Sequence, residues 1–133
     1  MQTRDQKYAA TVYEQVTKIK KEEEKHYKRY GAMAHKLPVL IRTAGLAQAL
    51  EFVNSRGKKE QKQLLNDLAI TIEQQDTSAL LNRARRSELS AYIRLTQQVM
   101  AALLWYKRFA QSVLGVDPSE ATETTLEDED END

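Results

Sequence analysis

The feature that most constrains the fold is helical periodicity that runs almost unbroken through the first 116 residues. Only four glycines and two prolines occur in 133 residues, and no stretch shows the β-branched alternation that is typical of a strand. Apolar residues recur instead at three- and four-residue intervals, as on one face of a helix. The sequence therefore predicts an all-α fold: a compact bundle of about five to seven helices, with long first and last helices.

The segment "LPVLIRTAGLAQALEFV", residues 37–53, shows how the helices divide. On a helical wheel, the apolar residues of its two halves lie on faces separated by roughly half a turn. Gly45 lies where the face changes. We therefore expect two short helices, the first begun by Pro38, whose missing N–H is harmless in a first turn. The second is expected to begin near Thr43 to Gly45.

The other expected helices follow from apolar spacing and from residues that favour helix ends. They are a first helix over 4–29, a helix over 59–75 after a C-cap at Gly57, a short helix through "SALLNRA" capped by Asp76 or Thr77, and a last helix over 88–114 capped by Ser87. The inward stripe expected on the last helix contains Leu89, Tyr92, Ile93, Val99, Met100, Leu103 and Leu114.

The net charge of zero conceals a strong segregation of charge along the chain. Residues 117–133 hold 9 of the 20 acidic residues and none of the 20 basic ones, which leaves residues 1–116 with 20 basic against 11 acidic residues, a balance of +9. We expect a helical domain over 1–116 and an acidic, disordered tail over 117–133. A basic body suggests a polyanionic partner or a partner with an acidic face. The simpler role of the tail is solvation, which we favour, and the alternative is that the tail competes with nucleic acid for the basic surface.

Three groups of basic residues are candidates for contacts with phosphates. They are Lys18, Lys21 and Lys25 on the first helix, Lys58 and Lys59 before the helix over 59–75, and Arg83, Arg85 and Arg86 in "RARR". The second group lies before a helix start, where the helix dipole disfavours cations by about a few tenths of a kcal/mol, which favours a functional role. The alternative is that these are ordinary exposed loop lysines, which are common. The third lies at a helix C-terminus, where electrostatic capping explains the arginines nearly as well.

Arg42 is the best single candidate. It lies beside the Gly45 junction, where free N–H groups at a helix start together with a guanidinium would suit a phosphate. The alternative is that Arg42 pairs with a glutamate or stacks on a tyrosine.

Trp105 is unusual because it lies between Arg94 and Arg108 on the polar side of the last helix. The simpler interpretation is that the indole packs under a neighbouring helix or loop. The alternative is an anchor for another protein subunit, formed by these three residues, because tryptophan and arginine are enriched at interface hot spots.

The search for catalytic or metal-binding groups is negative. His26 and His35 are the only histidines. Glu22 lies one turn from His26, but no third ligand accompanies the pair, and we expect a solvated helix face with Glu24 and Lys28 paired. No glycine-rich phosphate loop or nucleophile–histidine set is evident. We therefore expect no enzymatic activity, no metal, no cofactor and no small-molecule substrate.

The cellular compartment is indicated by the lack of cysteines, of a signal peptide and of a membrane-spanning segment in the sequence. There are no cysteines, so neither disulfides nor thiolate metal sites can form. The N-terminal segment lacks the apolar core of a signal peptide, and the longest apolar run, "VMAALLWY" at 99–106, is too short to span a bilayer. The sequence predicts a cytoplasmic protein without membrane contact.

Two segments resemble a known family: "HKLPVLIRTAGLAQALEFV" (35–53) and "YIRLTQQVMAALLWYKRFA" (92–110). They are similar to the small subunit of Cmr-type, type III-B CRISPR effector complexes. The resemblance covers most of the body and omits the acidic tail. It implies an all-helical, non-catalytic subunit whose copies stack head to tail and contact the duplex of crRNA and target RNA.

The resemblance and the charge pattern together predict a module that helps to bind RNA in antiviral defence. Its partners would be crRNA, target RNA and other Cmr subunits, including further copies of itself. Its cations would neutralise backbone phosphates without reading bases. The alternative is a purely structural adaptor that bridges protein subunits with little RNA contact.

Overall fold

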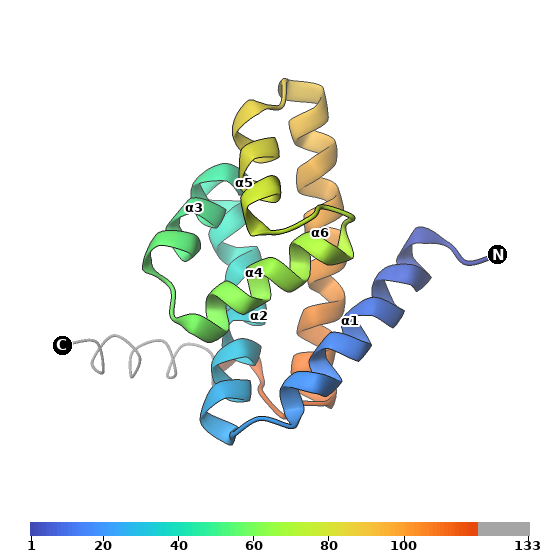
Figure 1. Cartoon of the computed structure of the whole chain (residues 1–133), viewed down its shortest axis with the longest axis vertical. Helices are drawn as coiled ribbons and strands as arrows, with labels where there is room; N and C mark the ends of the chain where they lie inside the picture. Colours follow the sequence, from blue (N-terminus) through green and yellow to red (C-terminus); the bar gives the residue numbers. More distant parts are fainter. Residues whose placement is uncertain (120–133) are drawn as a thin grey trace.

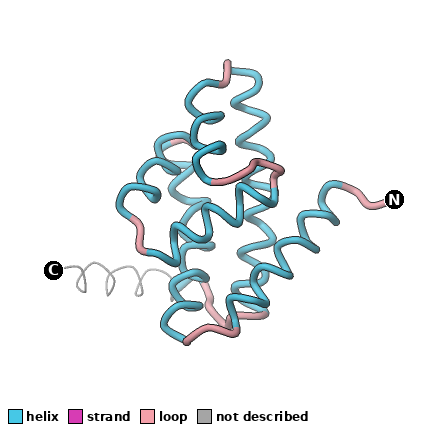
Figure 2. Tube along the Cα trace, viewed as in Figure 1, coloured by secondary structure: helices cyan, strands magenta, loops and turns pink. Residues whose placement is uncertain are grey.

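The computed structural model describes residues 1–119, and these form six helices joined by short turns (Figures 1 and 2). The helices are α1 (Arg4–Lys20), α2 (Glu24–Ala44), α3 (Leu46–Arg56), α4 (Lys59–Thr71), α5 (Thr77–Arg86) and α6 (Leu89–Ser112). The described part of the chain contains no strand. The predicted all-α bundle and its number of helices are confirmed.

The longest helix, α6, extends along most of the long axis of the molecule (Figure 1). It packs against α1, α2 and α4, and α3 and α5 pack on each other and on α4. One continuous apolar core joins all six helices, and its largest fully buried side chains are Tyr30, Tyr106, Leu37, Leu46, Leu50, Leu64, Leu65, Leu68, Leu80, Leu95, Leu103 and Val12.

The first helix ends earlier than expected. The prediction of one helix over 4–29 is wrong, because the chain turns at residues 21–23 between α1 and α2. The buried stripe of α1 ends at Ile19. Its next helical positions are the glutamates Glu22 and Glu23, which cannot continue an apolar contact with the core. The turn lets Tyr27 and Tyr30 pack against the core from a second helix.

Pro38 does not begin a helix. It lies inside α2 and is buried, although an interior proline removes one backbone hydrogen bond. Buried residues on both sides of it, Leu37 and Ile41 among them, keep the helix packed through that point. The predicted break at Gly45 is confirmed: its φ of 90° is a conformation that favours glycine, and α3 begins at the next residue.

The ends of the shorter helices were predicted in part. Gly57 is the C-cap of α3, and the Asp76 carboxylate accepts a hydrogen bond from the Ala79 N–H (2.8 Å) as the N-cap of α5. The helix expected over 59–75 ends at Thr71. Ser87 does not cap α6, because its hydroxyl donates to the Arg83 carbonyl at the end of α5 (2.7 Å).

The inward face of α6 differs from the expected stripe at its first turns. Leu89 and Ile93 are 74% and 48% exposed, because these turns extend beyond α1 and α4 at the top of Figure 1. The buried residues of this helix are Leu95, Val99, Ala102, Leu103, Tyr106 and Ala110. Burial here depends on where neighbouring helices end, which apolar spacing does not encode.

The chain after α6 returns to the side of α2. Gly115 adopts a left-handed φ of 70°, and the Val116 N–H donates to the Ala110 carbonyl (2.9 Å), which closes the helix end. Val116 is buried, and its carbonyl accepts a hydrogen bond from the His35 imidazole (2.8 Å). The core therefore extends to residue 116. Most of the predicted acidic tail, residues 120–133, lies outside the described residues.

Candidate nucleic-acid interface

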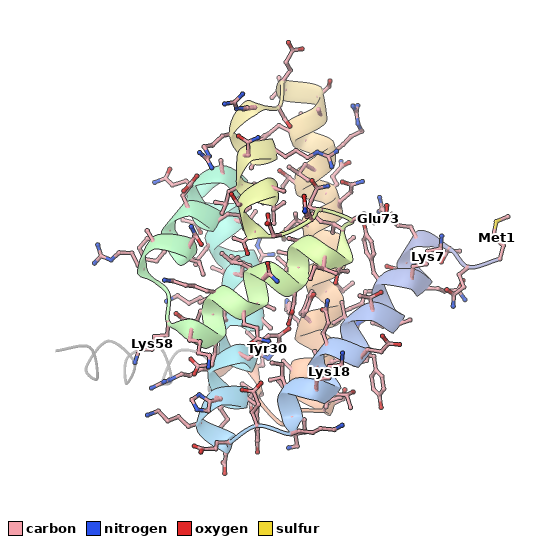
Figure 3. All side chains as sticks on the ribbon, viewed as in Figure 1. Met1, Lys7, Lys18, Tyr30, Lys58 and Glu73 are labelled. Atoms are coloured by element: carbon pink, nitrogen blue, oxygen red, sulfur yellow. The ribbon has the colours of Figure 1, made fainter. Side chains whose placement is uncertain are left out.

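Lys18, Lys21 and Lys25 are all exposed around the turn between α1 and α2. Lys18 lies in the last turn of α1 and Lys21 is its C-cap, where the negative end of the helix dipole favours cations. Figure 3 shows Lys18 near the lower end of the molecule. The structure therefore brings these three lysines to one end of the bundle.

Lys58 and Lys59 lie at the start of α4, as its N-cap and its first residue. Lys58 is half-buried, its backbone N–H donates to the Gln61 side chain (2.8 Å), and Lys59 is exposed. Figure 3 places Lys58 in the lower half of the molecule, as it does Lys18. These lysines therefore add positive charge to the same half of the bundle as the turn between α1 and α2.

Glu60 ties this helix start to α2. Its carboxylate is buried, bonds to the imidazole of His26 and lies 3.9 Å from the Arg29 guanidinium. Burial alone would raise the pKa of Glu60, but a backbone hydrogen bond, His26 and Arg29 outweigh it and lower the pKa below 4.5. His26 thus pairs with Glu60 of α4, and the expected pair of Lys28 with Glu24 is present (2.7 Å).

Arg42 is exposed in the last turn of α2, at the Gly45 junction. One N–H group expected to be free there is occupied, because the Ala47 N–H donates to the Tyr92 hydroxyl of α6 (3.0 Å). Tyr92 therefore caps the start of α3. A phosphate at this junction would rely on the Arg42 guanidinium more than on backbone donors.

The arginines Arg83, Arg85 and Arg86 are exposed in the last turn of α5. Arg85 forms an ion pair with Glu51 of α3 (2.9 Å) and also donates to the Leu81 carbonyl (3.3 Å). It therefore joins α3 to α5, whereas neither Arg83 nor Arg86 forms an ion pair with an acid of residues 1–119.

The candidate cations do not form one patch. The end of α5 lies at the top of Figure 1, and the turn between α1 and α2 lies at the bottom. The 24 residues of α6 run between these ends, a length of about 36 Å at 1.5 Å per residue. The sequence predicted the residue types of these groups but not their separation.

Trp105 is half-buried between α6 and the start of α1. Its indole N–H donates to the Asp5 carboxylate (3.0 Å), its ring stacks on Phe109 (5.7 Å between centroids), and the Arg108 guanidinium lies 4.9 Å from the ring centroid. Arg94 lies 11 residues, or about 16.5 Å, nearer the start of α6. Arg108 therefore joins Trp105 in one cluster, but Arg94 does not.

The cluster around Trp105 continues as an exposed aromatic surface. Tyr13 of α1 packs edge-on against Phe109 (5.3 Å) and is 51% exposed. Aromatic side chains in such a setting are typical of protein interfaces. The contacts of Trp105 with Asp5 and Phe109 agree with an indole packed under a neighbouring helix. The exposed side chain of Tyr13 beside it leaves room for contact with another subunit.

Sequence reasoning missed a buried polar cluster that joins four helices. Tyr30 of α2 donates to the Asp67 carboxylate of α4 (2.7 Å), and the Tyr106 hydroxyl bonds to Gln15 of α1 and to Thr71 of α4. Burial raises the pKa of Asp67 despite the hydrogen bond from Tyr30. The signal in the sequence was an aspartate inside the apolar segment "LLNDLAI". Because these groups satisfy one another, the cluster fixes helix packing.

A cleft of about 550 Å³ between α1 and the end of α4 was also not predicted, and its lining includes Arg4, Lys7 and Glu73. In the described residues, no group of three His, Cys, Asp or Glu side chains is placed to hold a metal ion. Within residues 1–119, none of the helices combines the length and the apolar character needed to cross a membrane.

Comparison with known proteins decides the family. The sequence profile of the CRISPR-associated protein family Cas_Cmr5 matches residues 4–113. The chain belongs to the Cmr5 family. The "CRISPR system Cmr subunit Cmr5" of Thermus thermophilus is 49% identical over 114 residues, which cover 86% of this chain and 98% of that protein.

A solved structure supports the Cmr5 assignment at the level of the fold. The crystal structure of a CRISPR-associated Cmr5 family protein from Thermus thermophilus has a TM-score of 0.81 at 50% identity, covering 85% of this chain and 98% of that chain. The Cmr5 profile spans every candidate cation and Trp105 and ends at residue 113. The acidic segment from residue 117 onward therefore lies outside the Cmr5 match.

Proposed function

We propose that this chain is a non-catalytic subunit of a type III-B CRISPR (Cmr) RNA-targeting complex and that its exposed cations contact the backbone of the crRNA–target RNA duplex. Membership of the Cmr5 family supports the assembly, since the Thermus relative carries the name of a Cmr subunit. The observation that carries the RNA contact is the charge of the body, +9 over residues 1–116.

The positions of the candidate cations support this role. Every one of them is exposed except the half-buried Lys58, so most ammonium and guanidinium groups can reach a phosphate without unfolding. Groups at both ends of the roughly 36 Å α6 helix suit a ligand that extends along the subunit. Phosphate neutralisation releases counterions and reads no sequence, which suits a subunit that accepts any guide.

The described residues offer no arrangement that favours catalysis. His26 is hydrogen-bonded to Glu60, and His35 is buried and bonds to the Val116 carbonyl. The buried tyrosines have raised pKa values because burial disfavours their charged forms, so they remain neutral hydroxyls. Binding and assembly therefore account for the visible chemistry better than turnover does.

A second candidate function is a structural adaptor that bridges protein subunits, including copies of itself. The exposed aromatic surface around Tyr13, Trp105 and Phe109 favours it. The two functions are compatible, but they differ in what the isolated protein binds.

The test is a titration of the isolated protein with a labelled RNA duplex at several salt concentrations. Binding that weakens linearly on a log–log plot as salt increases supports the RNA contact. Failure to bind RNA at low salt, combined with capture of other Cmr subunits by the tagged protein, would favour the adaptor.

A further inference from the structure

We propose that the acidic segment 120–133 docks on a lysine surface formed by α2 and α4 of its own chain and competes there with RNA. This surface, the α2–α4 lysine surface, consists of Lys25, Lys36, Lys58, Lys59 and Lys62. The inference rests on the proposed function only for the competition with RNA. The docking is argued from the described residues and the charge of the segment.

The first observation is where the chain leaves the core. Val116 packs so closely against α2 that a Cβ on Gly31 would lie 3.0 Å from its Cγ2 atom. Its carbonyl is held by His35, one turn further along the same helix. Asp117 follows and is exposed. The chain therefore leaves the core at Val116, beside the middle of α2, and residue 120 follows four positions later in the sequence.

The second observation is the arc of α2 next to that point. At about 100° per residue, Gly31 and His35 face Val116, whereas His26 and Arg29 face Glu60 at the start of α4. Lys25 and Lys36 project from the arc between these two contacts. On the surface of α2, these two lysines therefore lie between Val116, where the chain leaves the core, and the first turn of α4.

The lysines at the start of α4 complete the surface. Lys58 precedes the helix, Lys59 is its first residue, and Lys62 follows one turn later. The nearest acid of that turn, Glu60, is buried and already engaged with His26 and Arg29. The surface therefore gathers five lysines around a helix start whose buried acid, Glu60, contacts His26 and Arg29.

The segment 120–133 matches this surface in charge. Residues 117–133 contain nine acidic residues, and subtracting Asp117 leaves eight in 120–133 and no cation. Fully extended, 14 residues reach at most about 50 Å, so length alone permits contact with any side of the domain. Proximity to the exit and the density of lysines select the α2–α4 surface, since a short tether gives a high effective concentration there.

Docking would lower the affinity for RNA because Lys58 and Lys59 are also candidate phosphate contacts. A segment that is docked nine-tenths of the time would reduce the apparent affinity about tenfold. Salt weakens the docking itself, so this reduction should diminish as the salt concentration increases. The segment lies outside the Cmr5 match, so this competition between the acidic segment and RNA would be an addition to the family fold.

Docking is tested without RNA by zero-length carbodiimide crosslinking of the full chain, which joins carboxylates to amines in direct contact. We expect intramolecular crosslinks from 120–133 to the α2–α4 lysine surface, with few to Lys7, which Figure 3 shows on the opposite side from Lys58. Crosslinks that reach Lys7 as often, or that join separate chains, would overturn the docking.

Competition is tested by comparing RNA affinity for the full chain and a chain ending at Ser119, which keeps Val116 and the core. A third chain replaces the eight carboxylates of 120–133 with amides and controls for length. We expect both variants to bind RNA about tenfold more tightly at low salt. Equal affinities would overturn the competition. An absence of RNA binding in all three contradicts the proposed function instead, while the crosslinks still decide the docking.

Discussion

Replacing Gly31 with alanine tests the close contact between α2 and the end of the chain. The added Cβ would lie 3.0 Å from Val116 Cγ2, 3.1 Å from its Cβ and 3.3 Å from Leu114 Cδ1. Alanine stabilises a helix interior by about 1 kcal/mol relative to glycine, but overpacking a core costs about 1–3 kcal/mol. Because the clash is with a buried side chain, we expect Gly31→Ala to destabilise the protein by about 1 kcal/mol.

A double-mutant cycle separates this contact from other effects. Val116→Ala removes two methyl groups from a side chain that is 1% exposed, at about 0.8 kcal/mol each plus a cavity cost, or about 2 kcal/mol in total. In the double variant the new methyl group at residue 31 enters the space left by Val116. We expect a loss of about 1 kcal/mol rather than the sum of about 3 kcal/mol.

Urea unfolding followed by far-ultraviolet circular dichroism measures all three variants against the parent chain. The reasoning is refuted if the two costs add, or if Gly31→Ala increases stability by the full helix preference of alanine. Either result would mean that residues 114–116 do not pack against α2, and the exit of the acidic segment would then be misplaced.

Two further predictions concern ion pairing and the aromatic surface. Because the pKa of Glu60 is lowered in the folded protein, the ionised carboxylate stabilises the fold at neutral pH, and this stabilisation is lost as pH falls below 4.5. Glu60→Gln should therefore be less stable than the parent at pH 7 but lose less stability on acidification, which urea unfolding at a series of pH values measures. Trp105→Ala should impair incorporation into the complex by about 2 kcal/mol, whereas Asp5→Ala, which removes the hydrogen bond to the indole but keeps the ring, should not. Co-purification with tagged Cmr subunits checks this, and incorporation of a folded Trp105→Ala protein equal to that of the parent chain would contradict an anchor role.

Features that depend on local chemistry could be predicted from the sequence. Gly45 marks a helix break because its φ of 90° favours glycine, and Asp76 caps a helix through its own side chain. The charge segregation was likewise visible in the order of residues. The helix ends that depend on distant contacts were not predicted. Pro38 remains inside α2 because tertiary packing outweighs its local preference.

In the candidate site too, some features followed from residue type and others depended on how the helices pack. The exposure of the lysines and arginines followed from their type, since charged side chains seldom lie unpaired in a core. Their partners did not follow, because Arg85 meets Glu51 and Trp105 meets Asp5 only after the helices pack. The distance between the two cationic ends is likewise a property of how α6 lies in the bundle.

The most direct test of the central claim is the salt dependence of RNA binding by two matched variants of α1. Lys18→Ala with Lys21→Ala removes two candidate contacts, and Arg4→Ala with Lys7→Ala removes the same charge at the other end of that helix. Each lost phosphate contact should reduce the log–log slope by about 0.7–0.9. We predict a reduction of about 1.5 for the first pair and little change for the second. Equal slopes for the two variants would contradict direct contact of Lys18 and Lys21 with the RNA backbone.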